Sequence, residues 1–179
     1  MSRIGRKPVP IASGVTVNLT PAAALVKGPK GALTIPMPRG IRCTQDNGRL
    51  LVARGDDTKV QRALHGLVRA LLANAVSGVT TGFTRELEIE GIGYRAALAG
   101  KMLTLSLGYS HPVEYPIPDG ISISVDKQVR ITVTGPNKQQ VGQTAAEIRG
   151  LRPPDVYKAK GIRYAGEVIR KKVGKTGAK

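Results

Sequence analysis

The chain has 179 residues, enough for one ordinary domain or two small ones, and its 28 Lys and Arg against 12 Asp and Glu give a net charge of +16. Hydrophobic residues make up 41% of the chain but aromatic residues only 3%, so any core must rest on Val, Ile, Leu and Ala. Every apolar run falls far short of the roughly 20 residues that span a bilayer, so we expect no membrane insertion and look for a polyanionic partner.

The N-terminal arm is basic and has no sign of a secretory signal. It begins Met-Ser-Arg-Ile-Gly-Arg-Lys-Pro, without the apolar stretch of an exported precursor. Its candidate contacts with an anionic partner are Arg3, Arg6 and Lys7. The single cysteine, Cys43, cannot form an internal disulfide, so we expect a cytoplasmic protein. One cysteine and two histidines also offer little for a metal site, and we expect no metal or other cofactor.

The positive charge is concentrated toward the two ends of the chain. Residues 1–82 carry twelve basic and three acidic side chains, residues 83–147 six and seven, and residues 148–179 ten and two. The net charges of these segments are +9, −1 and +8, which add up to +16. This pattern predicts a dedicated binding surface centred on the C-terminal segment, with a contribution from the first half.

The first half of the chain shows short strands followed by one long helix. Asp56 and Asp57 offer an N-cap before Thr58, and the helical periodicity runs to about Val76, with Gly78 as a natural stop. Its spacing predicts one buried stripe made of Val60, Leu64, Leu67, Leu71 and Ala75. The cations that fall off this stripe, and should stay available to water or phosphate, are Lys59, Arg62 and Arg69.

The chain contains an internal duplication. Residues 16–19 match residues 86–89 at an offset of 70, and residues 50–55 match residues 130–135 at an offset of 80. The difference is an insertion near residues 108–117, in the second copy only. Two copies are too few for a solenoid, so the duplication predicts two similar small domains.

Each copy has the same order of several strands and then one helix, so the predicted fold class is α+β. We expect two tandem similar small domains, each a mostly antiparallel sheet packed with one helix, followed by a basic C-terminal tail. The boundary falls within residues 77–83, which gives domains of residues 1–82 and 83–179. Alternating apolar and polar residues over residues 86–90 and 121–125 have the period of half-buried strands.

Two glycine-containing stretches of the second copy resemble nucleotide-binding loops only superficially. Gly91 to Ala96 fits the pattern G-x-G-x-x-A, but that site needs a helix directly after it, and strand-like sequence lies on both sides here. Such glycines more often mark a bulge or a close backbone approach. Gly100-Lys101 is followed by Met102, where a phosphate loop needs Ser or Thr, and is better interpreted as a hairpin turn.

Few side chains of the sequence could act as catalytic bases or nucleophiles. The usual candidate bases are His65, within the first helix, and His111, in a loop-like stretch of the insertion. Ser110 adjoins His111 in sequence, but catalytic groups must meet in space. Loop structure or RNA contact is the favoured interpretation of His111, and we expect no catalytic residues and no enzyme.

A second helix is predicted from Pro136 to Gly150. Its buried face consists of Val141, Ala145 and Ile148. Its N-terminus has two interpretations of equal weight. Either Asn137 caps the helix, or the exposed backbone amides of the first turn bind a phosphate together with Lys138.

Residues 149–164 form the segment best suited to RNA. Pro153 and Pro154 forbid a continuing helix and stiffen the chain. Cations here can neutralise phosphates, and tyrosine can stack on an unpaired base, so a folded RNA fits better than a DNA groove. The candidate contacts are Arg149, Arg152, Tyr157, Lys158, Lys160 and Arg163.

The last ten residues have the Gly and Lys content of a tail that orders only on binding. By itself such a tail does not specify the polyanion. Its candidate contacts are Arg170, Lys171, Lys172 and Lys175.

Segments along the whole chain resemble the bacterial ribosomal protein L6 family of the large subunit. The run Pro-Asp-Val-Tyr-Lys-Ala-Lys-Gly-Ile at residues 154–162 resembles the family signature, with Ala159 where glycine is also common. The arm at residues 2–5, Val-Lys-Gly-Pro-Lys-Gly at residues 26–31 and Gly-Tyr-Ser-His-Pro at residues 108–112 agree with it, as do residues 138–143.

The resemblance implies a tandem α+β duplication bound to 23S rRNA near the base of the stalk, close to the sarcin–ricin loop where translational GTPases dock. It implies that the second domain makes the main rRNA contact and that neighbouring large-subunit ribosomal proteins are partners. We expect no membrane partner and no homo-oligomer. The acidic run Glu86, Glu88 and Glu90 should face solvent or a neighbouring protein.

Two other functions account for parts of the sequence. A non-ribosomal DNA- or RNA-binding module explains the charge but not the resemblance along the whole chain. The interpretation as a nucleotide-using enzyme depends on the pattern at residues 91–96 alone.

Overall fold

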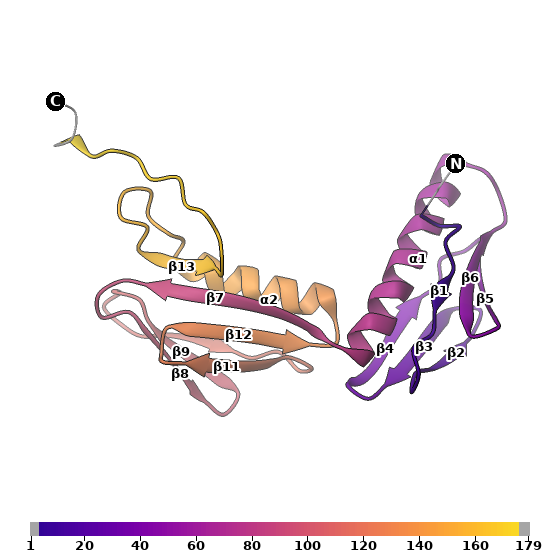
Figure 1. Ribbon diagram of the computed structural model, residues 1–179, viewed down its shortest axis with the longest axis horizontal. Helices are drawn as coiled ribbons and strands as arrows, with labels where there is room; N and C mark the ends of the chain where they lie inside the picture. The colour runs from indigo at the N-terminus through magenta and orange to yellow at the C-terminus, as the bar shows by residue number, and fades with distance from the viewer. Residues whose placement is uncertain (1–3, 176–179) are drawn as a thin grey trace. The chain divides into compact units, whose positions relative to one another are not determined.

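The computed structural model describes residues 4–175, which fold as two compact units. The first unit contains the chain up to Phe83 together with Pro136–Lys138, and the second contains Thr84–Gly135 and the chain from Gln139 onward. Each unit holds antiparallel strands in two sheets and one helix (Figure 1). The predicted α+β class is confirmed.

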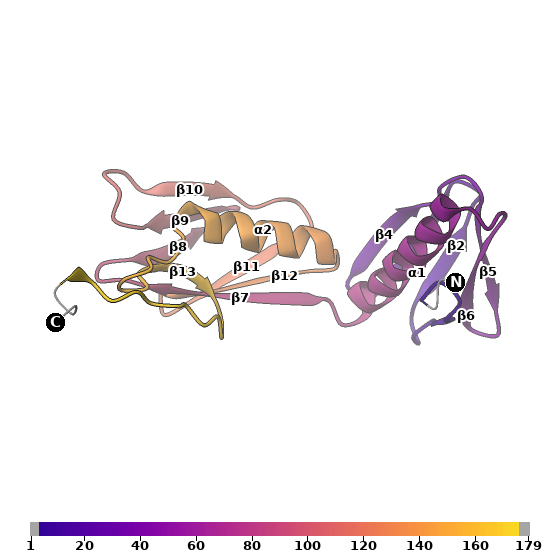
Figure 2. The same ribbon diagram turned by 90° about the horizontal axis from the view of Figure 1, so that it is seen from above.

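The first unit consists of six strands followed by a helix. Two three-stranded sheets, ordered β1-β6-β5 and β2-β3-β4, pack against the helix α1 (Figures 1 and 2). The elements are β1 (Val9–Pro10), β2 (Thr16–Leu19), β3 (Ala23–Gly28), β4 (Gly31–Pro36), β5 (Ile41–Asp46), β6 (Arg49–Arg54) and α1 (Lys59–Thr80). The β5–β6 hairpin turns through Asn47 and Gly48, which both have positive φ, as a two-residue Asn-Gly turn requires.

The helix α1 differs from the prediction at both ends. Its N-cap is Thr58, whose hydroxyl accepts from Gln61 N–H, and not the preceding aspartates. The helix continues through Gly78 to Thr80 and ends where Gly82, at φ 77°, donates its N–H to Ser77 O.

The predicted buried stripe of α1 is wrong in phase at Val60 and Leu67, although Ala75 is buried as predicted. Val60 is 66% exposed and Leu67 is 53% exposed. The buried face lies about one residue farther along the chain and consists of His65, Val68, Leu72, Ala75, Val76, Gly78 and Val79. Apolar residues occupy more than one side of this helix, so the position of the sheets, and not the periodicity alone, selects the buried face.

The second unit repeats this order with additions. Its sheets are ordered β11-β12-β7-β13 and β10-β9-β8, and α2 covers them on one side (Figures 1 and 2). The elements are β7 (Phe83–Glu90), β8 (Arg95–Ala99), β9 (Met102–Ser106), β10 (Val113–Pro116), β11 (Ser122–Asp126), β12 (Arg130–Gly135), α2 (Lys138–Leu151) and β13 (Gly161–Tyr164).

The duplication predicts the strand positions well. At the two offsets, β3 and β4 correspond to β8 and β9, while β5 and β6 correspond to β11 and β12. The predicted match of residues 16–19 with residues 86–89 is wrong in the structure, because β2 pairs with β3, whereas β7 lies beside β12 as β1 lies beside β6. The insertion forms β10, which pairs with β9. In α2 the predicted residues Val141, Ala145 and Ile148 are buried, together with Thr144.

Each unit has an aliphatic core, as the composition requires. In the first unit the largest fully buried side chains include Leu50, Leu72, Val9, Val26 and Val68. In the second unit they are Leu87, Leu103, Leu105, Leu107, Ile131, Ile148 and Ile162.

Candidate nucleic-acid interface

A short loop, residues 152–160, joins α2 to β13 and carries the centre of the predicted RNA-binding segment. Its backbone is closed by its own hydrogen bonds: Asp155 N–H donates to Lys160 O at 2.9 Å, and Ala159 N–H donates to Asp155 O at 2.9 Å. At its base Ile162 N–H donates to Arg152 O at 2.8 Å. These bonds fix the loop before any ligand arrives. We call residues 152–160 the C-terminal loop.

Two small residues allow this loop to close. Ala159 is buried and has φ 59°, a conformation that favours glycine, so glycine would fit at this position as well. Gly161 has φ 145°, and a Cβ there would lie 2.7 Å from Pro153 O and 2.8 Å from Arg152 O. The backbone leaves no room for a side chain at Gly161.

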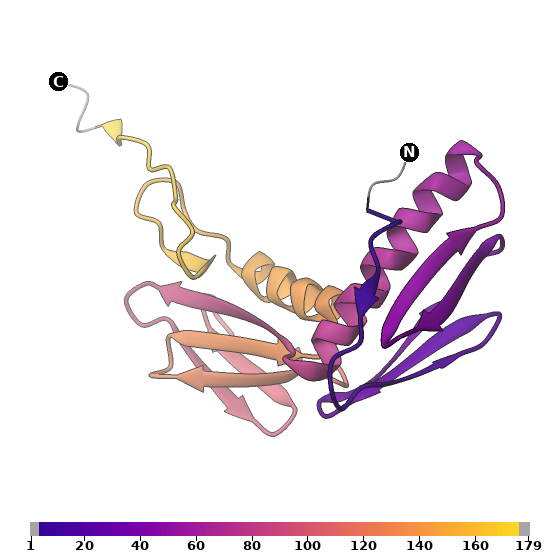
Figure 3. The same cartoon turned by 45° about the vertical axis from the view of Figure 1, so that its right-hand side comes forward.

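The tail segment, residues 165–175, lies alongside the C-terminal loop (Figures 1 and 3). Lys172 N–H donates to Val156 O at 2.8 Å, and Ala165 N–H donates to Glu86 O at 3.0 Å. Apart from Arg152, six side-chain cations of the loop and tail form no ion pair among the described residues: Lys158, Lys160, Arg170, Lys171, Lys172 and Lys175. Tyr157, between them, is 56% exposed. The structure thus gathers most of the predicted C-terminal contacts in one place.

Two other predicted contacts are held by carboxylates of the same unit. Arg149, in the last turn of α2, bonds Glu167 through two nitrogens at 2.5 and 3.0 Å, and this bond lowers the pKa of Glu167 below the usual carboxyl value. Arg163, on β13, lies 3.2 Å from both Glu88 and Glu90. Both arginines therefore have structural partners before RNA is considered.

These pairs correct the expectation for the acidic run. Glu88 contacts Arg163 and lies 3.6 Å from Arg130, and Glu90 shares Arg163. The residues face one another because β13 pairs with β7 in the register Arg163↔Glu88. Of the three glutamates in this run, only Glu86 forms no ion pair with a described residue, and it is exposed as expected.

Arg152 takes part in an aromatic cluster at the edge of the loop. Its guanidinium carbon lies 4.8 Å from the ring centroid of Tyr109, and hydrogen bonds with the Tyr109 and Tyr94 hydroxyls raise the pKa of Arg152. Tyr109 is fixed by donating its hydroxyl to Leu151 O at 2.9 Å. With Pro153, Asp155 and Lys160 these groups line a surface hollow of about 370 Å³.

Tyr94 and Tyr109 were not predicted as site residues. Gly91 and Gly108 explain how Tyr94 is seated: a Cβ at Gly91 would lie 2.6 Å from its ring, and one at Gly108 would lie 3.0 Å from it. The G-x-G stretch thus makes room for a tyrosine, and the strand β8 follows it where a dinucleotide site needs a helix. Tyrosines within loop-like, glycine-containing stretches were the signal available in the sequence.

The remaining predicted contacts lie elsewhere. Arg6 and Lys7 are exposed in the first unit, and Arg3 lies outside the described residues. Lys138 opens α2 and belongs to the first unit, with its Nζ 5.8 Å from the centroid of the Phe83 ring. His111 is exposed in the β9–β10 connection, with its Nδ1 3.4 Å from Ser110 Oγ.

Two polar residues of α1 have structural partners. His65 is buried, with Nε2 2.9 Å from Val52 O and Nδ1 3.1 Å from Arg54. Arg69, expected to be available to phosphate, instead donates to Lys7 O at 3.1 Å and Pro8 O at 3.4 Å, holding the N-terminal arm against α1.

Other classes of site are not supported within residues 4–175. No group of three His, Cys, Asp or Glu side chains there could hold a metal ion. No helix in that range is both long enough and apolar enough to cross a membrane.

The family model for ribosomal protein L6 matches the chain twice, over residues 11–82 and 90–165, in agreement with the two copies of the fold. The chain belongs to the ribosomal protein L6 family. It is 58% identical to the large ribosomal subunit protein uL6 of Koribacter versatilis, 54% to that of Bdellovibrio bacteriovorus and 53% to that of Rubrobacter xylanophilus. These alignments cover 99–100% of the chain and 100% of each relative.

Membership of the L6 family settles the broad function class. The family is structural and non-enzymatic, so the nucleotide-using enzyme is excluded. The L6 resemblance seen in the sequence is confirmed.

Proposed function

We propose that this chain, a structural constituent of the large ribosomal subunit in the bacterial cytoplasm, binds 23S rRNA through the C-terminal loop and the tail segment. The observation that carries the proposal is the set of six cations, from Lys158 to Lys175, that no carboxylate of the described chain neutralises. So dense a charge is stabilised by phosphates.

The loop and the tail segment have different parts in this mechanism. The loop holds Lys158 and Lys160 on a backbone closed by its own hydrogen bonds, which favours a defined set of phosphate contacts. The tail segment adds charge along an irregular backbone that can follow the RNA surface. The exposed ring of Tyr157 offers a surface on which an unpaired base can stack.

The location on the subunit follows from the family resemblance. We infer a site near the base of the stalk and close to the sarcin–ricin loop, where the chain would support the region in which translational GTPases dock. Neighbouring large-subunit proteins would be its protein partners. Arg6 and Lys7 of the N-terminal arm, with Arg3, would supply a second and smaller contact.

The test is the salt dependence of binding. Full-length protein is titrated against a 23S rRNA fragment that carries the sarcin–ricin region and, as a comparison, against a fragment of equal length from another domain. Replacing Lys158, Lys160 and Lys172 with Gln should weaken binding to the first fragment. It should also reduce the slope of log K against log salt by about 2 to 3, because each phosphate contact contributes about 0.7–0.9.

A matched control changes the same charge in the same unit. Arg85, Arg95 and Lys127 are exposed and form no ion pair among the described residues, so replacing them with Gln should leave affinity and slope nearly unchanged. Equal losses from both triple variants would contradict the site. Binding that is independent of salt, or equal for the two fragments, would contradict the proposed function itself.

A further inference from the structure

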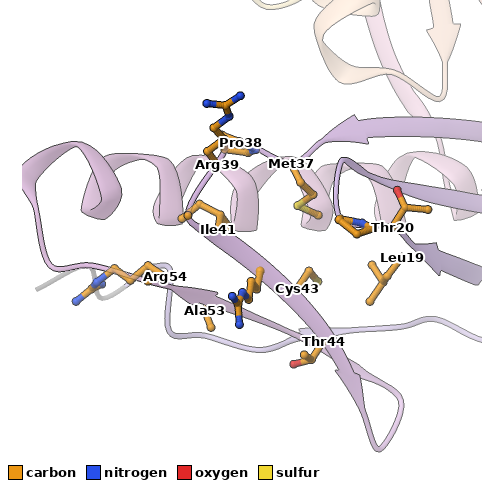
Figure 4. Close-up of a pocket in the computed structure, with 14 residues that line it drawn as sticks. Leu19, Thr20, Met37, Pro38, Arg39, Ile41, Cys43, Thr44, Ala53 and Arg54 are labelled. Atoms are coloured by element: carbon orange, nitrogen blue, oxygen red, sulfur yellow. The ribbon is translucent and has the colours of Figure 1, made fainter.

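The first unit has an open groove that the site described above does not use. It has a volume of about 870 Å³ and runs along β5, between this strand, the end of β2 and the β4–β5 connection. In Figure 4 the side chains of Leu19, Met37 and Cys43 come from these three segments and gather along the groove. Its floor is therefore largely apolar.

The second copy of the fold buries the corresponding side chains. At offsets of 70 and 80 residues, Met37 and Cys43 correspond to Leu107 and Ile123. These two are only 0% and 5% exposed, whereas both groove residues are partly exposed. The strand partners show the same contrast: Val52, opposite Cys43, is partly exposed, while Val133, opposite Ile123, is fully buried. The groove is a core region that the first copy leaves uncovered.

The backbone shows how the two copies differ here. In the second unit Val129 O accepts from Ile89 N–H of β7 at 2.8 Å, and Gln128 O, in the β11–β12 turn, accepts from Ala96 N–H of β8 at 2.8 Å and joins the two sheets. The first unit keeps the counterpart of the former bond, since Gly48 O accepts from Ile11 N–H at 2.9 Å. Among the described residues its β5–β6 turn makes no backbone hydrogen bond to β3, so this link between the sheets is present in the second unit only.

The edge of the groove is positively charged. Arg39 and Arg42 are exposed along it, and its lining contains no acidic residue. Its aliphatic floor also lacks an aromatic side chain on which a nucleobase could stack. β5 is an edge strand of the sheet β1-β6-β5, and such an edge can pair with an added strand.

We propose that this groove binds an extended segment of a neighbouring large-subunit protein, which adds apolar side chains to the floor and acidic side chains opposite Arg39 and Arg42. The segment completes in the first unit the core that the second unit completes from its own chain. The groove belongs to the first unit, whereas the C-terminal loop and the tail segment belong to the second.

Alkylation of Cys43 reports whether the groove is covered, because Cys43 lines the groove and is the only cysteine of the sequence. The rate of alkylation by N-ethylmaleimide is compared for the free protein and for assembled subunits. A pH of about 8.5 is used because burial raises the pKa of the Cys43 thiol, and the thiolate is the reacting form. An occupied groove should slow alkylation in the subunit by about tenfold or more, because reaction then requires local opening. Equal rates in the two states would overturn the proposal.

Cross-linking identifies the occupant. A benzophenone maleimide is attached to a Thr44→Cys variant in which Cys43 is Ser, the protein is reconstituted into subunits, and the photoproducts are analysed by mass spectrometry. Thr44 lies at the exposed edge of the groove, so the reagent need not block it. A cross-link to an Asp- or Glu-containing protein segment is expected, and a cross-link to rRNA alone would overturn the proposal.

Charge variants test the acidic nature of the segment. Arg39→Glu with Arg42→Glu should abolish the protection of Cys43 in subunits, whereas Arg49→Glu with Arg62→Glu, which changes exposed arginines outside the groove, should retain it. Circular dichroism of the free variants checks folding, and the Arg39→Gln, Arg42→Gln pair replaces the reversal if that variant does not fold. Protection that survives neutralisation of both arginines would contradict an acidic occupant.

Discussion

At the scale of single residues, the cations of the second unit differ in what holds them. Arg149 and Arg163 are bound by carboxylates, Arg152 lies over a tyrosine ring, and the lysines of the C-terminal loop have no ion pair among the described residues. Arginine and lysine are therefore not interchangeable at all of these positions. A planar guanidinium can lie between two rings, whereas an ammonium acts as a point charge.

Arg152→Lys tests this distinction. The variant keeps the charge but loses the planar contact with Tyr109, so we expect rRNA affinity to fall about fivefold, or roughly 1 kcal/mol, with an unchanged salt slope. Lys158→Arg serves as the control and should bind like the parent. Filter binding at several salt concentrations measures both quantities, and an unchanged affinity for Arg152→Lys would show that only its charge matters.

Gly161→Ala should be among the most damaging small substitutions in the second unit. Its Cβ would meet the Pro153 carbonyl at a positive φ, and we expect a loss of about 2–4 kcal/mol in the free energy of unfolding. Ala159→Gly should change the free energy of unfolding by no more than about 1 kcal/mol. Glycine removes the backbone strain at φ 59°, and this gain offsets the greater entropy that it gives the unfolded chain. Urea unfolding followed by tyrosine fluorescence reports on this unit, because all five tyrosines lie in it. Equal stabilities for the two variants would contradict the steric argument.

At the scale of elements, α1 shows what periodicity can and cannot determine. The helix and the approximate spacing of its buried residues could be predicted, but the phase could not, because Val60 and Leu67 form a second apolar side. The pairing of Arg163 with Glu88 could not be predicted from the sequence either, because it joins residues 75 positions apart and depends on the register between β13 and β7. The strands were easier to place because the duplication supplied each pattern twice.

Leu72→Ala and Leu67→Ala test the phase of α1 directly. Leu72 is fully buried, so its truncation should lower the free energy of unfolding by about 2–5 kcal/mol. Leu67 is half exposed, and its truncation should cost about 1 kcal/mol or less. Chemical unfolding monitored by far-UV circular dichroism gives both values, and a larger loss for Leu67→Ala would restore the predicted stripe.

The strand β10 is tied to α2 by a hydrogen bond with a measurable pH signature. Burial and the bond to Glu147, at 2.5 Å, raise the pKa of Tyr115 to about 12, and the same bond lowers the pKa of Glu147. Since folding raises the pKa of Tyr115, its contribution to stability is complete below about pH 10 and is lost as pH rises toward 12. The contribution of Glu147 is present above the ordinary carboxyl pKa and is lost as pH falls through its lowered value.

Tyr115→Phe should therefore remove the last component of the phenolate absorbance titration, the one with its midpoint near pH 12. The pKa of Glu147, followed by carboxyl-detected NMR, should rise in the same variant. An unchanged titration curve, or an unchanged Glu147 pKa, would show that the bond between β10 and α2 does not form in solution.

At the scale of the whole molecule, the charge is distributed unevenly along the chain. Deleting residues 170–179 removes five cations and no acid, which lowers the net charge from +16 to +11. We expect the salt slope of rRNA binding to fall by as much as about 4, with little change in the unfolding of either unit. Thermal unfolding provides the control, and a deletion that leaves the slope unchanged would exclude the tail from the interface.

The self-bonded C-terminal loop has a kinetic consequence. A backbone that is already closed loses little entropy when it meets RNA, so contacts from Lys158 and Lys160 should chiefly prolong the lifetime of the complex. The tail segment carries charge that acts at a distance, and it should chiefly accelerate the first encounter. The C-terminal loop should therefore govern chiefly the dissociation rate of the complex, and the tail segment chiefly its association rate.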